Sequence, residues 1–154
     1  MQEQLSSNNQ TRTQSNISDT TSNRTRSDAQ NLPFLLRHKF EKRQQWAQQA
    51  RLEYPGKLPL ILERGSDQAA IEKLVNPKFL IPATFSVYEL QGIIRQKLNL
   101  DKQTNLFLLV NGKHLMKNDT KLSLIYDDHR NEDGFLYIQY ATENTLGAIS
   151  HFDE

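Results

Sequence analysis

The chain has 154 residues, 36% of them hydrophobic, and its 19 Lys and Arg residues nearly balance 18 Asp and Glu residues, giving a net charge of +1. This length suits one ordinary domain with a tail. Because the net charge is so small, the chain as a whole provides no strong electrostatic attraction to nucleic acid. The absence of cysteine excludes disulfides, thiolate nucleophiles and thiol-ligated metal centres. The longest apolar run, from Leu106 to Val110, is five residues, against about 20 needed to cross a bilayer. We therefore expect a soluble, cytoplasmic protein.

The first 31 residues differ in composition from the rest of the chain. Ser, Thr, Asn and Gln supply 21 of them, and large apolar side chains are almost absent. Such a segment buries too little apolar surface to offset the entropy lost on ordering. We predict a disordered polar leader over residues 1–31 and one domain over residues 32–142, where apolar residues recur at regular spacing.

The first part of this domain predicts a helix followed by two strands. An amphipathic stretch rich in Gln, Lys and Ala predicts a helix from Phe40 to about Glu53, ended by the Pro-Gly pair after Tyr54. Alternating leucines predict a strand over residues 58–63, and residues 79–82 are a second extended segment. Pro59 has no N–H to donate, so we expect its nitrogen to face no strand partner.

The second part predicts a helix, a hairpin, a short helical turn and a last strand. Ser86 and Glu89 fit a capping box, and the apolar spacing after it predicts a long helix. The pair Asn111-Gly112 tolerates positive φ angles and predicts a type I′ hairpin between residues 106–110 and 113–116. A turn of helix over 122–126 and a strand over 135–140 complete an α+β order. This is the order of the ubiquitin-like β-grasp, with one or two extra N-terminal helices.

The chemistry-bearing residues do not form the pattern of an enzyme. The four histidines, at positions 38, 114, 129 and 151, share no metal-ligand spacing. The sequence contains no G-x-G-x-x-G, no P-loop and no G-x-S-x-G motif. We predict a protein that is not an enzyme and that uses no cofactor and no metal.

Four segments resemble, in order and spacing, the autophagy-related protein 8 family of ubiquitin-like modifiers, the type of GABA-receptor-associated protein and microtubule-associated protein light chain 3. They are the F-E-K-R run from Phe40, K-L-P-L-I-L-E from Lys57, K-F-L-I-P from Lys78, and D-G-F-L-Y-I from Asp133 followed by E-N-T-L-G ending at Gly147. The resemblance spans residues 32–147.

The resemblance implies that Gly147 is the site of protease cleavage and of lipidation. In this family a cysteine protease trims the precursor after the glycine, and activating and conjugating enzymes then join the glycine to phosphatidylethanolamine. Residues 143–147 would be a flexible conjugation tail, and residues 148–154 a propeptide removed on maturation. The implied function is autophagosome formation, with the protein in the cytoplasm and, once lipidated, on autophagosomal or vesicle membranes.

Members of the family also bind cargo receptors through peptides of the form aromatic-x-x-aliphatic, and strand alternation favours such a groove here. With the leucines of residues 58–62 facing the long helix, Pro59 and Ile61 face the other side, where only the N-terminal helix can cover them. The peptide would add as a strand along Lys78 to Ile81, and Lys57 and Lys78 would attract its acidic flank. Carried over by position, the aromatic pocket is Pro59, Ile61, Lys78, Leu80 and Phe135 beside the Phe40 helix, and the aliphatic pocket is Phe79, Ile81, Pro82, Phe85, Leu90 and Ile93.

Three positions depart from the family pattern at this groove. On the Phe40 helix, Trp46 and Ala50 stand where the family usually has an acid and an isoleucine. Lys57 replaces the common arginine, so this position lacks the planar guanidinium that can bind a carboxylate through two hydrogen bonds. We expect a large indole beside the space left by an alanine to reshape the aromatic pocket.

Two other interpretations of the chain stay open. In the first, the chain is a ubiquitin-like tag attached to proteins through the same glycine. In the second, the chain is an unconjugated ubiquitin-like adaptor that uses only the groove. The C-terminus distinguishes the three, because it would carry a phospholipid adduct, a branched lysine adduct, or an intact tail ending in Glu154.

Overall fold

The computed structural model describes residues 31–66, 68 and 71–142, and the chain divides into two units between Arg37 and His38. In the first unit the described element is α2 (Phe34–Arg37), a single turn in which the Pro33 carbonyl accepts hydrogen bonds from the N–H groups of Leu36 and Arg37. The predicted leader, conjugation tail and propeptide lie outside the described residues, apart from Asn31.

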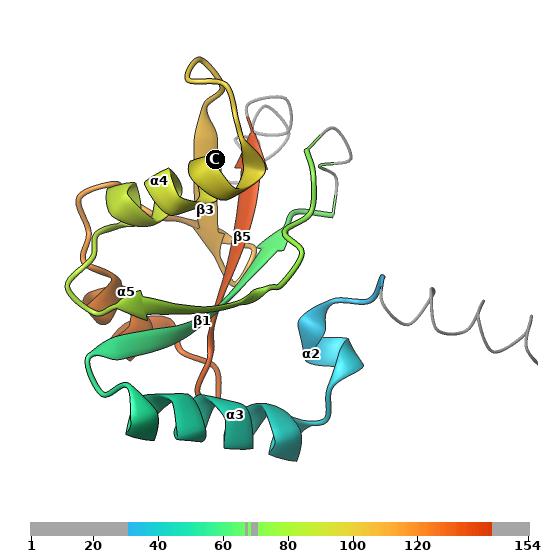
Figure 1. The fold of residues 1–154 in the computed structure, drawn as a ribbon, viewed down its shortest axis with the longest axis vertical. Coiled ribbons are helices and arrows are strands. Elements are labelled where there is room, and N and C mark those ends of the chain that lie inside the picture. Colours follow the sequence, from blue (N-terminus) through green and yellow to red (C-terminus); the bar gives the residue numbers. More distant parts are fainter. Residues whose placement is uncertain (1–30, 67, 69–70, 143–154) are drawn as a thin grey trace, which may run out of the picture. The chain divides into compact units, whose positions relative to one another are not determined.

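The second unit is a mixed sheet with helices, in the predicted order (Figure 1). Its elements are α3 (Phe40–Glu53), β1 (Lys57–Arg64), β2 (Lys78–Pro82), α4 (Val87–Leu98), β3 (Leu106–Val110), β4 (His114–Leu115), α5 (Leu122–His129) and β5 (Leu136–Thr142). The strands are ordered β2-β1-β5-β3-β4, with β1 and β5 parallel and the other neighbours antiparallel. The α+β prediction is confirmed, and β2 lies at an edge of the sheet.

Local sequence signals explain where the elements begin and end. The Ser86 hydroxyl accepts a hydrogen bond from the Glu89 N–H at 3.3 Å, which caps the first turn of α4 as predicted. Asn111 and Gly112 have φ angles of 54° and 68°, the positive values predicted for this turn, and the Lys113 N–H closes it on the Val110 carbonyl at 3.1 Å. The register pairs Val110 with His114, so three residues connect the strands, and β4 is shorter than the predicted segment 113–116. The last strand runs two residues beyond the predicted end at Tyr140, because the following residues still pair with β3.

The helix α5 is longer than the predicted turn over residues 122–126. It continues to His129, and the N–H of Arg130 closes its last turn on the carbonyl of Tyr126. The three added residues are charged or polar, so the apolar pattern alone did not mark them as helical.

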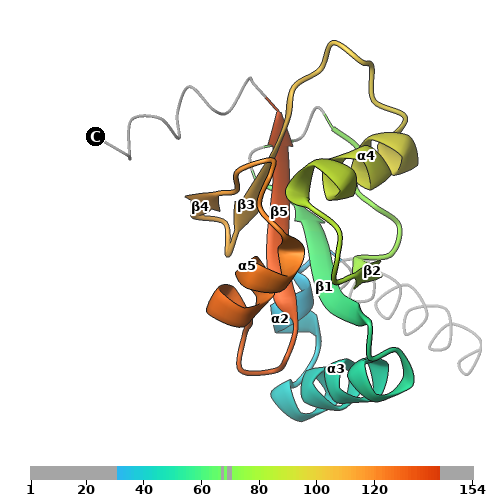
Figure 2. The same cartoon turned by 90° about the vertical axis from the view of Figure 1, so that its left-hand side faces the viewer.

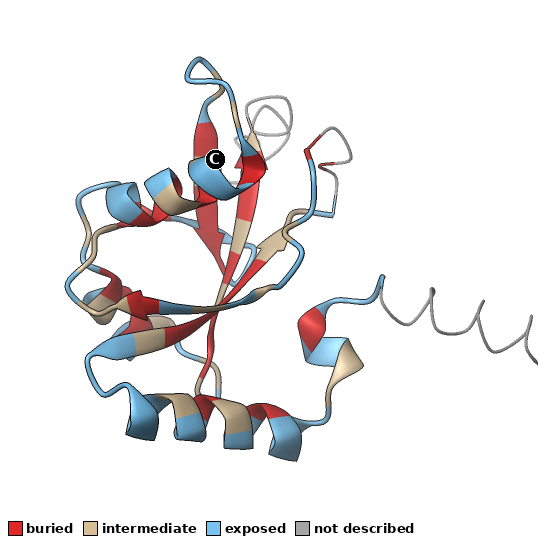
Figure 3. Ribbon diagram, in the orientation of Figure 1, coloured by how far each residue is buried: buried red, intermediate tan, exposed pale blue. Residues whose placement is uncertain are grey.

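The main hydrophobic core lies between α4 and one face of the sheet. Leu60 and Leu62 of β1 and Leu90 and Ile94 of α4 belong to it, and all four are at most 1% exposed. Figures 1 and 2 show α3 and α4 well apart, with the strands between them. Figure 3 shows that α3 is buried on one side only and exposed on the other. Within the described residues, no helix is long and apolar enough to cross a membrane.

Candidate functional site

A cavity of about 350 Å³ opens between the C-terminal half of α3 and the strands β1 and β2. Most of its wall is apolar or aromatic, which suits a large hydrophobic side chain. The lining residues are Trp46, Gln49, Ala50, Glu53, Tyr54, Pro59, Lys78, Phe79, Leu80 and Phe135. We call this space the aromatic cavity.

The aromatic cavity brings together six of the residues predicted for the aromatic pocket, namely Trp46, Ala50, Pro59, Lys78, Leu80 and Phe135. Ile61 does not line it, because this side chain is 0% exposed and belongs to the interior. Lys57 also lies outside the lining, with its Nζ atom 5.5 Å from the centre of the Tyr54 ring. Of the two β1 residues predicted to line the aromatic pocket, Pro59 therefore does so and Ile61 does not.

Three lining residues were not predicted. Gln49 and Glu53 follow Trp46 on one face of α3, at the spacing of neighbouring turns, and Tyr54 ends the helix. The side-chain amide of Gln49 donates a hydrogen bond to the Glu53 carboxylate at 3.0 Å. Helical spacing from Trp46 was the signal that could have found these residues.

The predicted aliphatic pocket divides into a surface layer and a buried layer. Phe79, Phe85 and Ile93 are partly buried and pack against the main core, and Pro82 is also half-buried. Ile81 and Leu90 are 3% and 0% exposed, so they support this surface from beneath. Phe79 also lines the aromatic cavity, so this ring lies between the two predicted pockets.

The open edge of β2 lies next to the aromatic cavity. The Leu62 N–H donates to the Pro77 carbonyl at 2.9 Å, and the Ala83 N–H donates to the Gly56 carbonyl at 3.0 Å. These bonds fix which residues of the β1–β2 ladder are hydrogen-bonded pairs, because such pairs alternate in an antiparallel ladder. Leu80, opposite Pro59 in the register, is in a non-hydrogen-bonded pair. Its N–H and C=O therefore point away from β1, toward the open edge.

The same alternation accounts for the other backbone donors of β2. The N–H of Lys78 also points outward, and it donates to the Asn76 side chain at 3.1 Å. Pro82 has no N–H, so Leu80 supplies the free outward N–H within β2. Pro59 in turn loses no bond to β2, and the paired residues of β5 begin only opposite Leu60. The expectation that the Pro59 nitrogen faces no strand partner agrees with this register.

Lysines stack on the aromatic rings at the mouth of the aromatic cavity. The Nζ atom of Lys78 lies 4.2 Å from the centre of the Trp46 ring, and the Nζ atom of Lys42 lies 5.4 Å from it. The His38 ring meets the same indole edge-on, with 4.9 Å between centres. An ammonium over an aromatic face is attracted by the negative charge of the ring face. Basic groups therefore surround Trp46.

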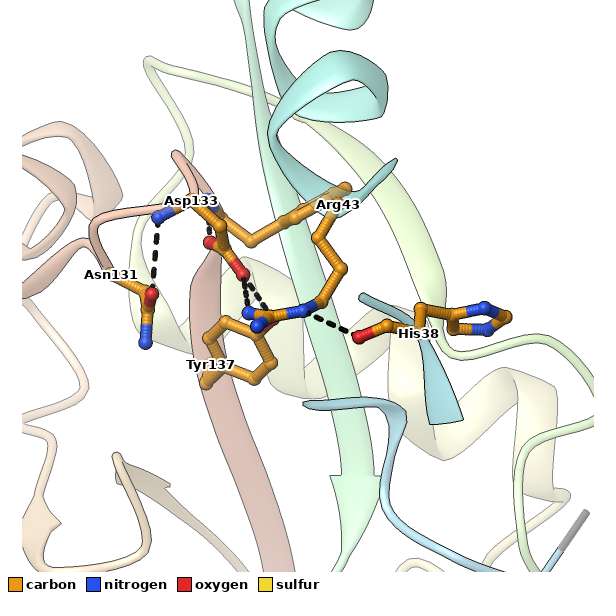
Figure 4. A network of polar contacts seen from close by, with 6 residues as sticks. His38, Arg43, Asn131, Asp133 and Tyr137 are labelled. Atoms are coloured by element: carbon orange, nitrogen blue, oxygen red, sulfur yellow. Dashed lines mark hydrogen bonds and ion pairs between the residues drawn. The ribbon is translucent and has the colours of Figure 1, made fainter. Parts of the chain in front are cut away.

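A buried polar network fixes the helix that carries Trp46 (Figure 4). The Arg43 guanidinium contacts the Asp133 carboxylate at 2.5 Å, and its Nε donates to the His38 carbonyl at 3.0 Å. The Tyr137 hydroxyl donates to the same carboxylate at 2.5 Å. Burial, together with the hydrogen bond to Asp133, raises the pKa of Tyr137 well above its ordinary value. The network joins α3 to the turn before β5.

A mixed five-stranded sheet with α4 across one face, preceded in the sequence by N-terminal helices, defines a ubiquitin-like protein with a helical extension. The crystal structure of Trypanosoma brucei ATG8 is similar, with a TM-score of 0.69 and 30% sequence identity. The similarity covers 73% of this chain and 96% of that one.

The family model described as "Autophagy protein Atg8 ubiquitin like" matches residues 42–147. Autophagy-related protein 8 of Schizosaccharomyces pombe is 37% identical over 115 residues, 73% of this chain and 92% of that protein. Human microtubule-associated protein 1 light chain 3 gamma is 32% identical over 117 residues, 76% of this chain and 80% of that protein.

The chain belongs to the Atg8 family of ubiquitin-like autophagy proteins, as its sequence motifs predicted. Members of this family are ubiquitin-like modifiers and not enzymes. Membership implies the autophagy conjugation machinery and cargo receptors as partners.

Proposed function

We propose that this chain is conjugated through Gly147 to phosphatidylethanolamine, acts in autophagosome formation and recruits cargo receptors through the aromatic cavity and the edge of β2. The protein would be cytoplasmic before conjugation and on autophagosomal or vesicle membranes afterwards. The processing protease and the activating and conjugating enzymes would be its partners at the C-terminus.

The observation that carries the conjugation proposal is the extent of the family match, which ends at residue 147 and leaves residues 148–154 outside it. A glycine at that position lacks a side chain that would obstruct the narrow sites where the glycyl ester forms. A lipid with two acyl chains would anchor a protein whose described helices include none able to span a membrane.

Peptide binding is supported by the pairing of an apolar cavity with an open strand edge. The aromatic cavity would hold an aromatic anchor, while the outward N–H and C=O of Leu80 would bond to the peptide backbone. The exposed ammonium of Lys78 would face the acidic flank of the peptide.

Mass spectrometry of the C-terminus in cells tests the conjugation proposal, with Gly147→Ala as the matched variant. We expect a phosphatidylethanolamine adduct on Gly147 of the wild type, and a diffuse, unconjugated protein for the variant. A branched lysine adduct would support the protein-tag alternative, and an intact tail ending in Glu154 would support the adaptor alternative. Either result contradicts lipidation at Gly147.

A further inference from the structure

A second cleft, of about 800 Å³, lies between α3 and the segment that joins α5 to β5. It shares no lining residue with the aromatic cavity, because it uses the opposite face of α3. Two arginines line it, Arg51 from α3 and Arg130 from the position after α5. We call this space the arginine cleft.

Both arginines of the cleft lie over one buried ring, that of Tyr126. The Cζ atom of Arg51 is 5.6 Å from the ring centre, and the Cζ atom of Arg130 is 5.7 Å from it. Tyr126 is 2% exposed, and its hydroxyl donates a hydrogen bond to the Gly134 carbonyl at 2.6 Å, so the ring is a fixed support. Burial raises the pKa of this tyrosine, and the charges of the two arginines oppose that rise. Tyr126 therefore holds two cations close to one place in the cleft.

The acids around the cleft neutralise these two cations only weakly. Arg51 forms no ion pair within the part of the chain that the structure describes. Arg130 contacts Asp127 at 3.8 Å, but these side chains are 47% and 70% exposed, so water screens the pair and it contributes little. Of the two acids in the lining, Asp133 belongs to the buried network described above, and Glu132 is exposed. The cleft therefore has positive charge available for an anion.

A phosphate monoester matches two guanidinium groups better than a carboxylate does. It carries a charge of about −1.5 to −2 at neutral pH and offers three acceptor oxygens, whereas a carboxylate carries one charge on two oxygens. One guanidinium fork can satisfy both oxygens of a carboxylate. Two guanidiniums beside one ring therefore favour a phosphate group as the ligand.

The rest of the cleft favours a phosphate that is attached to a peptide. The side-chain amides of Gln44, Gln48 and Asn131 line it, and amides can both donate to and accept from a peptide backbone. Leu52 is 76% exposed and adds an apolar wall beside Arg51. A concave site with its arginines over a buried ring suits an inserted side chain better than the flat surface of a membrane. The lining thus fits a phosphorylated residue that has an apolar neighbour.

We propose that the arginine cleft binds a phosphoserine or phosphothreonine of a partner protein. Arg51 and Arg130 donate hydrogen bonds to the phosphate oxygens, and Leu52 contacts an apolar residue beside the phosphorylated one. Because the aromatic cavity lies on the other face of α3, a peptide there leaves the arginine cleft open. Phosphorylation of a partner would therefore add a second contact to this protein without changing the first.

The test is an NMR titration of the full-length, ¹⁵N-labelled protein with the blocked peptide Ala-Ala-phosphoserine-Leu-Ala-Ala. We expect amide shifts confined to residues 44–55 and 130–134, with the Leu80 amide unchanged. The same peptide with serine should not bind, and the peptide with glutamate should bind more weakly than the phosphopeptide. Inorganic phosphate alone should also bind more weakly, because it makes no contact with Leu52.

Variants of the two arginines test their roles separately. Arg51→Gln and Arg130→Gln should each weaken the phosphopeptide by about tenfold or more, since each loses charge-assisted hydrogen bonds. Arg51→Lys keeps the charge without the planar fork and should lie between wild type and Arg51→Gln. Arg95→Gln removes the same charge from α4, outside the cleft lining, and should bind within about twofold of wild type.

Four results would overturn the proposal. They are no shift in the cleft with the phosphopeptide, equal binding of the phosphopeptide and the glutamate peptide, equal binding of the phosphopeptide and inorganic phosphate, and equal losses in Arg95→Gln and the two cleft variants. Titration with phosphatidylserine vesicles tests the membrane alternative. Vesicle binding that requires both arginines, without phosphopeptide binding, would assign the cleft to a lipid surface and also overturn the proposal. The wild-type measurements decide the first three results, so a variant that unfolds does not remove the test.

Discussion

The Nη1 atom of Arg43 lies 2.5 Å from the Oδ2 atom of Asp133, which joins α3 to the turn before β5 across 90 residues of sequence. The two side chains are 10% and 0% exposed. The other carboxylate oxygen accepts the N–H of Phe135 at 2.8 Å, so Asp133 also shapes the start of β5. Residues of α3 and Phe135 both line the aromatic cavity. The ion pair therefore positions two parts of its wall, α3 and the segment just before β5.

Arg43→Ala should strongly destabilise the domain, because it leaves the Asp133 carboxylate buried without its cation. Removing one partner of a buried pair costs about 3 to 5 kcal/mol. Urea denaturation at neutral pH measures this cost. Arg51→Ala is the matched control, since Arg51 is an exposed arginine on the same helix, and it should cost at most about 1 kcal/mol. Equal losses in the two variants would contradict a structural role for the ion pair.

Stability should fall at alkaline pH, in part through Tyr137. Burial first, and then the hydrogen bond to Asp133, raise the pKa of Tyr137 above its ordinary value of 10.0. The folded state therefore favours the neutral phenol, and this contribution is complete below about pH 10 and is lost as pH rises toward the higher pKa of the folded state. Urea denaturation between about pH 8 and pH 11 should give a shallower decline for Tyr137→Phe than for wild type. Tyr126 and Tyr140 also have raised pKa values, so the variant should still lose some stability at alkaline pH. Parallel declines in the variant and the wild type would show that Tyr137 does not contribute.

Leu80→Ala should weaken peptide binding more than Lys78→Ala. Leu80 supplies apolar wall to the aromatic cavity, and its loss should cost about 2 kcal/mol, whereas an exposed ammonium facing an acidic flank contributes at most about 1 kcal/mol. Calorimetric titration with a Trp-x-x-Leu peptide at two salt concentrations compares the variants. If Lys78→Ala is the weaker binder even at high salt, the apolar wall is not the main source of affinity.

Gly134→Ala should destabilise the domain, while Gly92→Ala should not. Gly134 has a φ angle of +95°, and a Cβ atom there would lie 3.0 Å from the Cβ of Ala47 on α3. Strain of this kind costs about 1 to 3 kcal/mol. Gly92 lies within α4, and a Cβ atom there meets nothing within 4 Å, so alanine should stabilise it by up to about 1 kcal/mol. Thermal unfolding of both variants tests the contrast in sign.

Much of the fold could be predicted because its signals are local. The capping box at Ser86 and the Asn111-Gly112 turn act over three or four residues, and both have the predicted geometry. The ends of α5 and β5 were less predictable, because tertiary pairing extends them beyond the apolar pattern. Elements were therefore easier to predict than their ends.

The candidate site was predicted in part, and the missing part is non-local. Alternation correctly separated Pro59 from the neighbouring leucines but could not show that Ile61 is fully covered, because that depends on packing from elsewhere in the chain. The pairing of Arg43 with Asp133 had no local signal, since neither residue has a distinctive spacing to the other. Trp46 was recognised as unusual, but its stacking with Lys78 depends on how α3 lies beside β2.

The open edge of β2 also affects whether copies of this protein associate with one another at high concentration. An exposed strand edge is a template for edge-to-edge aggregation unless its length or its side chains prevent that. Here the strand is five residues long, begins at a lysine and ends at a proline, and its first outward N–H is bonded to Asn76. Within β2, one outward backbone donor, the N–H of Leu80, remains for an incoming chain. Two copies meeting at this edge would form too few bonds to remain paired, so β2 should not drive association of the protein at high concentration.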